Sequence, residues 1–137
     1  MWWIYALLSA FFASLTAIFA KIGVTNVNSD LATAIRTVVV LIVAWGIAIA
    51  RGELKGITDL SRHSILFLIL SGIATGLSWI FYYKALQIGK VSQVAPVDKL
   101  SVALTIVLSV VILKETLSLK VAIGAVMIIS GTLVLIF

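Results

Sequence analysis

Five long apolar segments alternate with short polar joints along this chain. The apolar segments run over residues 3–22, 31–50, 65–86, 95–113 and 119–137. Each is close to the ~20 residues that a helix needs to cross the ~30 Å hydrocarbon core of a bilayer. The pattern therefore predicts an all-α integral membrane protein, a single domain over residues 1–137 with five transmembrane helices in the lipid bilayer.

The joints supply residues that begin helices. We expect Asp30 and Ser118 to cap the N-termini of the second and fifth helices, because their side-chain oxygens can accept hydrogen bonds from free backbone N–H groups. Pro96 is expected in the first turn of the fourth helix, where its missing N–H has no partner to lose. Small residues within the third helix (GIATG, residues 72–76) and at Gly124 and Gly131 predict close packing between helices.

Composition supports the membrane class and limits the chemistry. Of the 137 residues, 63% are hydrophobic and only 11% are charged, whereas soluble domains are about a quarter charged. The chain has no cysteine, so disulfides and thiolate metal sites are excluded. It has a single histidine, His63, which argues against a histidine-based metal site or catalytic triad. We expect no metal, no cofactor and no enzymatic activity, because no nucleophile–base pair or phosphate-binding glycine loop is visible.

The net charge of +5 does not indicate a nucleic-acid-binding protein. The ten basic residues occur singly, mostly at the ends of apolar runs, which is how membrane helices are terminated. Trp79, Tyr82 and Tyr83 are expected to anchor the third helix at one membrane interface. The alternative is that one of these three aromatic residues lines a ligand path.

An aspartate and a lysine fall where the fourth helix should lie within hydrocarbon. Only 14 uncharged residues separate Lys99 from Lys114, and as a helix they span ~21 Å, less than the ~30 Å core. Counting back from the far end of this helix places Asp98 ~6 Å inside the membrane, and the same count on the second helix places Arg36 ~7.5 Å inside from the same surface. Charges at this depth are costly and often functional.

Two interpretations of Asp98 remain open. Lysine and arginine can extend their charged groups to the interface, but an aspartate side chain is too short to do so. Asp98 therefore either pairs with Arg36 or Lys99, which would be a structural role, or faces a water-filled cavity, which would be a functional one.

A line of hydroxyl side chains continues from Asp98 along one face of the predicted helix. Asp98, Ser101, Thr105 and Ser109 are spaced 3, 4 and 4 residues apart, so they stay on one narrow face for three turns. A single hydroxyl in a membrane helix often only bonds the carbonyl one turn back, but a continuous polar face headed by an acid indicates the lining of a path. The substrate-path candidates are therefore Arg36, Asp98, Ser101, Thr105 and Ser109. The gate candidates are Lys84 and Lys99.

Several segments resemble, in their order and spacing, the EamA branch of the drug/metabolite transporter (DMT) superfamily. They are AIFAKIGVTNVNSDLATAIRTVV at residues 17–39, ALQIGKVSQVAP at 85–96, LKETLS at 113–118 and IGAVMIISGTLVL at 123–135. Similar proteins are usually ten-helix transporters built from two five-helix halves in opposite membrane orientation, and they move small metabolites by alternating access. This chain is similar to one half, so the resemblance implies a DMT-type inverted repeat completed by homodimerisation.

The resemblance thus implies a secondary transporter of a small polar metabolite in the prokaryotic inner membrane. Basic residues near the proposed gate favour an anionic or zwitterionic substrate. One alternative is a non-transporting membrane subunit or scaffold. Another is the flipping of a lipid-linked polar headgroup. None of these functions involves nucleic acid.

The distribution of basic residues bears on orientation. On the side of the N-terminus lie Arg51, Lys55, Arg62, Lys114 and Lys120. On the other side lie Lys21, Arg36, Lys84, Lys90 and Lys99. This even count predicts that both orientations are made, because a fixed orientation requires an excess of Lys and Arg on the cytoplasmic side. If the two intramembrane residues are excluded, the count becomes five against three and favours one orientation. We expect an antiparallel homodimer with dual topology.

Overall fold

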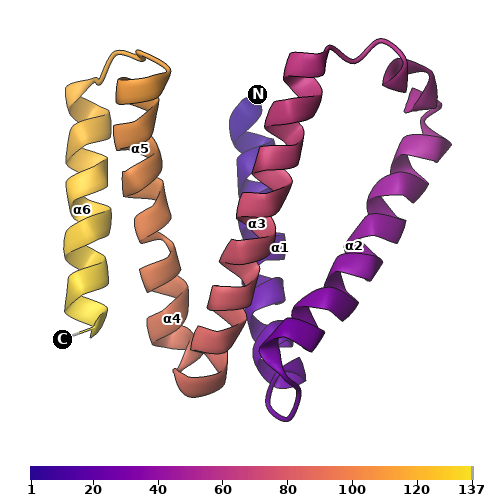
Figure 1. Cartoon of the computed structure of the whole chain (residues 1–137). Helices are drawn as coiled ribbons and strands as arrows, with labels where there is room; N and C mark the ends of the chain where they lie inside the picture. The colour runs from indigo at the N-terminus through magenta and orange to yellow at the C-terminus, as the bar shows by residue number, and fades with distance from the viewer. Residues whose placement is uncertain (137) are drawn as a thin grey trace. The chain divides into compact units, whose positions relative to one another are not determined.

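The regular structure of this chain is helical throughout the part that a computed structural model describes, residues 1–136 (Figure 1). The elements in chain order are α1 (Trp2–Gly23), α2 (Ser29–Ala50), the short 3₁₀ helix η1 (Glu53–Ile57), α3 (Arg62–Ile88), α4 (Val91–Asp98), α5 (Leu100–Ile112) and α6 (Leu119–Ile136). The fifth helix was predicted to end at Phe137, which lies outside the described residues.

Five helical segments are long and apolar enough to cross a membrane, with α4 and α5 together forming one of them, Val91–Ile112. In each segment, at most 11% of the most apolar stretch is buried within the chain. The large hydrophobic side chains therefore point outward, as they can only where the surroundings are also apolar. The predicted all-α membrane protein with five spans is confirmed.

The N-terminus of α2 differs from the sequence prediction. Asn28, not Asp30, is the N-cap, and its side-chain oxygen accepts a hydrogen bond from the backbone N–H of Asp30 at 2.8 Å. The helix starts earlier because Asn28 offers the same capping chemistry two residues sooner, which places Asp30 in the first turn. The Ser118 hydroxyl accepts from the N–H of Val121 at 3.3 Å, so the predicted cap of α6 is present.

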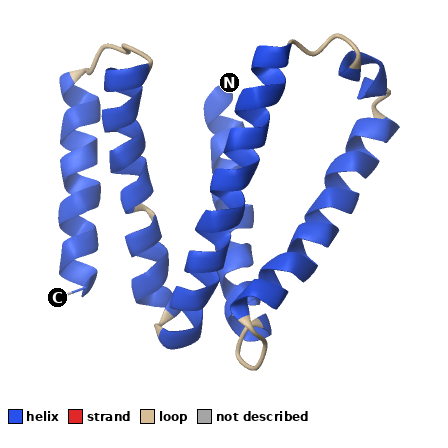
Figure 2. Cartoon of the chain, in the orientation of Figure 1, coloured by secondary structure: helices blue, strands red, loops and turns tan. Residues whose placement is uncertain are grey.

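The fourth span is not the continuous helix that was predicted over residues 95–113. It begins earlier, because the N–H of Val94 already bonds the carbonyl of Lys90 at 2.9 Å. It is then interrupted at Lys99, between α4 and α5, where Figure 2 shows a short loop-coloured break. Pro96 consequently lies well inside α4 rather than in a first turn, which corrects its predicted position.

The chain divides into two compact units, the first of which comprises residues Phe19–Gln87. In this unit α2 and α3 are closest where α2 begins and α3 ends, and they separate toward the connection that carries η1 (Figure 1). η1 folds back against the end of α2 and leaves a shallow, mainly apolar hollow of about 280 Å³. The residues around this hollow are Ala44, Trp45, Ala48, Glu53, Leu54 and Ile57.

The second unit comprises Met1–Ile18 together with the described residues from Ile88 onward. Within it α6 packs against both α4 and α5. Ala103 on α5 and Thr132 on α6 are buried, with 7% and 4% of their surface exposed.

Within their own units, the small residues do not bring helices into the close contact that was predicted. A methyl group added at Gly72, Gly76, Gly124 or Gly131 would meet no atom of its unit within 4 Å beyond its own local backbone. These faces therefore have room for side chains from outside their unit.

Candidate functional site

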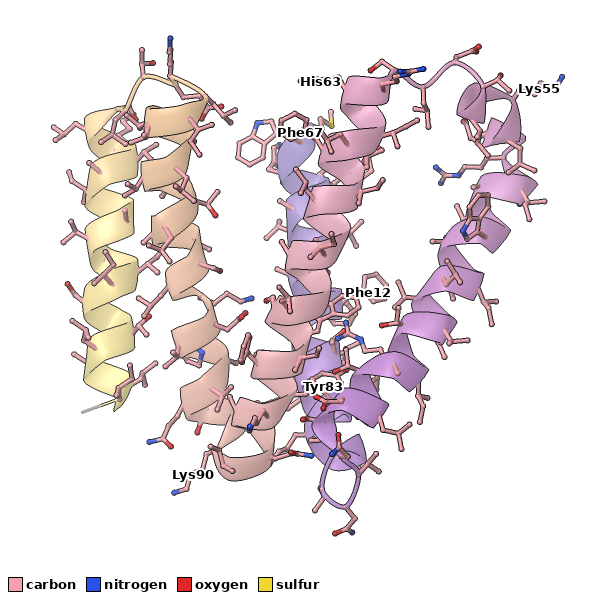
Figure 3. All side chains as sticks on the ribbon, in the orientation of Figure 1. Phe12, Lys55, His63, Phe67, Tyr83 and Lys90 are labelled. Carbon is pink, nitrogen blue, oxygen red and sulfur yellow. The ribbon has the colours of Figure 1, made fainter. Side chains whose placement is uncertain are left out.

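Arg36 is a charged side chain that lies against two aromatic rings. It lies two turns into α2, is half-buried, and its guanidinium carbon is 3.9 Å from the centroid of the Trp79 ring and 5.5 Å from that of Tyr83. Figure 3 labels Tyr83 on the part of α3 that lies next to α2. Trp79 and Tyr83 are one helical turn apart, so a single face of α3 presents both rings to Arg36.

The aromatic rings stabilise the positive charge of Arg36. A cation over an aromatic ring is stabilised by ~0.5–1 kcal/mol at exposed sites and ~2 kcal/mol or more when desolvated. Within its own unit, residues 19–87, no hydrogen bond or ion pair links the Arg36 side chain to another residue. None of its nitrogens is fully enclosed without a partner, so its donors reach the accessible surface of the unit.

A polar junction next to this stack fixes the end of α3. The ammonium group of Lys21, at the end of α1, donates to the carbonyl of Leu86, which is completely buried. The Gln87 amide donates to the carbonyls of Val24 and Val27 in the joint that precedes α2. These contacts join residues at least 60 positions apart, and they hold the end of α1 and the joint before α2 against the end of α3.

Asp98 pairs with its neighbour Lys99 at the break between α4 and α5. Their Oδ2 and Nζ atoms are 3.2 Å apart, and the side chains of Asp98 and Lys99 are 35% and 58% exposed. Lys99 is one of the two partners predicted for Asp98. A pair this exposed contributes at most ~1 kcal/mol to stability, so it does not explain why the charges lie here.

Thr132 supports the break from α6. At the break the N–H of Lys99 bonds the carbonyl of Pro96 at 3.0 Å, three residues back instead of four. The buried Thr132 hydroxyl lies 2.8 Å from the carbonyl of Ile128 and 3.4 Å from that of Pro96. The single hydroxyl hydrogen is shared between these two carbonyls, so α6 adds a weak second donor to a carbonyl next to the irregular backbone.

The predicted hydroxyl face lies beyond the break. Ser101 and Thr105 are exposed, whereas Ser109 is half-buried. The Thr105 hydroxyl donates to the Ser101 carbonyl at 2.8 Å and the Ser109 hydroxyl to the Ile106 carbonyl at 3.0 Å. The hydroxyl hydrogens of Thr105 and Ser109 are therefore used within the helix, so these two groups offer a ligand only acceptor lone pairs.

The predicted site residues belong to both units. Arg36 and the exposed Lys84 lie in the first, while Asp98, Lys99 and the hydroxyl face lie in the second. Sequence reasoning did not assign Trp79 and Tyr83 to Arg36. Their spacing of four residues on one helix, at the membrane side shared with Arg36, was the available signal.

Comparison with known proteins identifies the family and relatives of this chain. The sequence model of the EamA-like transporter family matches residues 1–137. A Sinorhizobium protein named "Uncharacterized transporter in cobO 3'region" is 47% identical over 134 residues, which cover 98% of this chain and 95% of that protein. An uncharacterized protein of Methanocaldococcus jannaschii is 36% identical over 81 residues, or 59% of each chain. No solved structure matches significantly.

Replacing Thr132 by valine tests its support of the break. We expect Thr132→Val to lower the free energy of unfolding by about 1 kcal/mol, because the volume is kept while the donor to Pro96 is lost. Equilibrium unfolding in detergent micelles measures this change. Thr75→Val is the matched control, since the exposed Thr75 bonds only the Ser71 carbonyl of its own helix. An equal loss in both variants would contradict the role given to Thr132.

Proposed function

Because this chain belongs to the EamA-like transporter family, we propose that it moves a small polar metabolite by alternating access as an antiparallel homodimer. The family lies within the DMT superfamily, and the chain is a multi-pass protein of the cell membrane. Membership in a transporter family also argues against an enzymatic role.

The observation that carries the proposal is Arg36 on the membrane-crossing helix α2. An ionisable side chain within a membrane span is expensive unless it lines a substrate pathway or finds a charged partner. Arg36 lies against the rings of Trp79 and Tyr83, and its N–H donors have no partner among residues 19–87 of its own unit. This arrangement suits a group that meets a ligand in the membrane interior.

The interrupted span supplies the second element of the proposal. Transporters built from repeats commonly bind substrate next to discontinuous membrane helices. The break at Lys99 and the exposed pair that it forms with Asp98 provide such an element. In our proposal the pair opens and closes one end of the substrate path, and the hydroxyl groups of Ser101, Thr105 and Ser109 line the path beyond it.

The proposed homodimer rests on the number of spans in residues 1–136. An inverted-repeat transporter binds substrate where its two repeats meet, and five spans form only one repeat. The open faces around Gly72 and Gly76 on α3 are suited to receive a helix of a second copy.

Transport by the purified protein tests the proposal directly. We expect counterflow of a small anionic or zwitterionic metabolite in proteoliposomes, assayed with a panel of radiolabelled amino and organic acids. Asp98→Asn should lower the rate at least ~10-fold while changing the free energy of unfolding by less than ~1 kcal/mol, because the lost ion pair is exposed. Asp59→Asn, on the exposed joint before α3, is the control and should transport normally.

The absence of counterflow for every compound would favour a subunit or scaffold role. Movement of a fluorescent lipid-linked headgroup without counterflow of soluble compounds would instead favour flipping.

Cysteine labelling tests the antiparallel arrangement, since the natural sequence has no cysteine. Lys55→Cys places a thiol on η1. Lys55 is exposed and is labelled in Figure 3. We expect an impermeant maleimide to label this residue from both sides of the membrane, because the two chains of the dimer are inverted. Labelling from one side only, in protein that still transports, would refute the antiparallel dimer.

Substitution of Gly76 tests the dimer interface. Gly76→Leu should leave the single chain intact, because its side chain meets open space, but should shift the protein from dimer to monomer in detergent. Ala74→Leu adds the same kind of bulk on the opposite face of α3 and serves as the control. Size-exclusion chromatography with light scattering measures the mass. Equal dissociation in both variants would show that this face has no special role.

A further inference from the structure

The orientation of the Arg36 side chain limits which ligands it can bind. The guanidinium carbon lies over the Trp79 ring, 3.9 Å from its centroid, so the ring covers one side of this group. The five N–H donors of a guanidinium lie in its plane and point outward along its edge, so stacking does not use them. What remains for a ligand is therefore the planar edge.

The chemistry of this edge favours a carboxylate. Two parallel N–H donors match the two oxygens of a carboxylate, giving a bidentate pair that is about twice as strong as a neutral hydrogen bond. Arg36 supplies one positive charge, and a carboxylate supplies one negative charge. A phosphate carries about −1.5 to −2 at neutral pH and would need a second cation to be neutralised.

A nearby cation is already committed to the protein. Lys21 donates to the buried carbonyl of Leu86 at the end of α3, which holds its ammonium group at the helix terminus. In the same unit no carboxylate of Asp30, Glu53 or Asp59 forms an ion pair with Arg36. The acidic partner of the guanidinium is thus not supplied by the described residues of its unit.

We propose that the exposed edge of Arg36, held in plane by Trp79 and Tyr83, binds the carboxylate group of a monocarboxylate ligand. This rests on the proposed function only in taking that ligand to be the transported substrate; the binding itself does not require transport. Trp79 is a positioning residue, because it fixes the plane of the guanidinium without contacting the carboxylate.

Binding to the full chain in lipid nanodiscs tests the inference. The probes are propionate, benzoate and alanine, each compared with its primary amide at equal ionic strength. The readouts are the midpoint of thermal unfolding and the fluorescence of Trp79, isolated by subtracting a Trp79→Phe sample. We expect saturable shifts with at least one carboxylate and none with its amide, because the amide keeps the shape but lacks the charge.

Variants of Arg36 separate charge from geometry. Arg36→Gln should abolish carboxylate binding, and Arg36→Lys should weaken it by about 10-fold, because a lysine keeps the charge but loses the planar fork. Lys55→Gln, which removes an exposed charge on η1, should bind as the natural chain does. Trp79→Leu should weaken binding, whereas Phe81→Leu, on the exposed face of α3, should not.

Three results would overturn the inference. They are equal shifts with carboxylates and amides, unchanged binding by Arg36→Gln, and no binding of any carboxylate while inorganic phosphate binds. Its failure is distinguishable from that of the proposed function. Carboxylate binding without counterflow would leave this site standing and remove the transport proposal, and counterflow without Arg36-dependent carboxylate binding would do the reverse.

Discussion

Hydrocarbon offers no hydrogen bonds, so each polar group in a membrane span must find its partner within the protein. Most of this chain meets that constraint locally. The hydroxyls of Thr33, Thr37, Thr75 and Thr105 each donate to a carbonyl one turn back on their own helix. Lys21 and Gln87 meet it over a long distance, by reaching backbone carbonyls of other segments. Because these groups are satisfied, they hold the structure together and leave little for a ligand.

Two places meet the constraint only in part, and both lie at charged residues. At the break between α4 and α5 the regular backbone pattern stops, and Thr132 on α6 adds a donor. At Arg36 the aromatic rings stabilise the charge but leave the N–H donors without acceptors within the unit of residues 19–87. Incomplete satisfaction in the membrane has a cost, and a bound ligand can offset it. The residues that we propose to contact a ligand therefore lie at Arg36 and at the break between α4 and α5.

Hydrophobic periodicity and length were sufficient to predict the five spans, because a bilayer of fixed thickness requires ~20 apolar residues from each. The depth of Arg36 and Asp98 was also accessible by counting residues. The break at Lys99 was not, since Pro96 is compatible with either a helix start or an irregular interior. The partners of Arg36 could not be predicted either, because they depend on how α2 meets α3. Small-residue patterns predicted close packing but do not specify which helix is the partner, and no helix of the unit formed by residues 19–87 fills the space at Gly72 and Gly76.

The contact between Lys21 and Leu86 also affects how the chain is made. The two residues are 65 positions apart, so the partner of Lys21 does not exist when α1 first leaves the ribosome. At ~5–20 residues per second, synthesis of the intervening chain takes roughly 3–13 s. During this interval α1 and α2 enter the bilayer without the junction that later ties them to α3. This junction therefore cannot influence how the first two spans insert until the third span has been made.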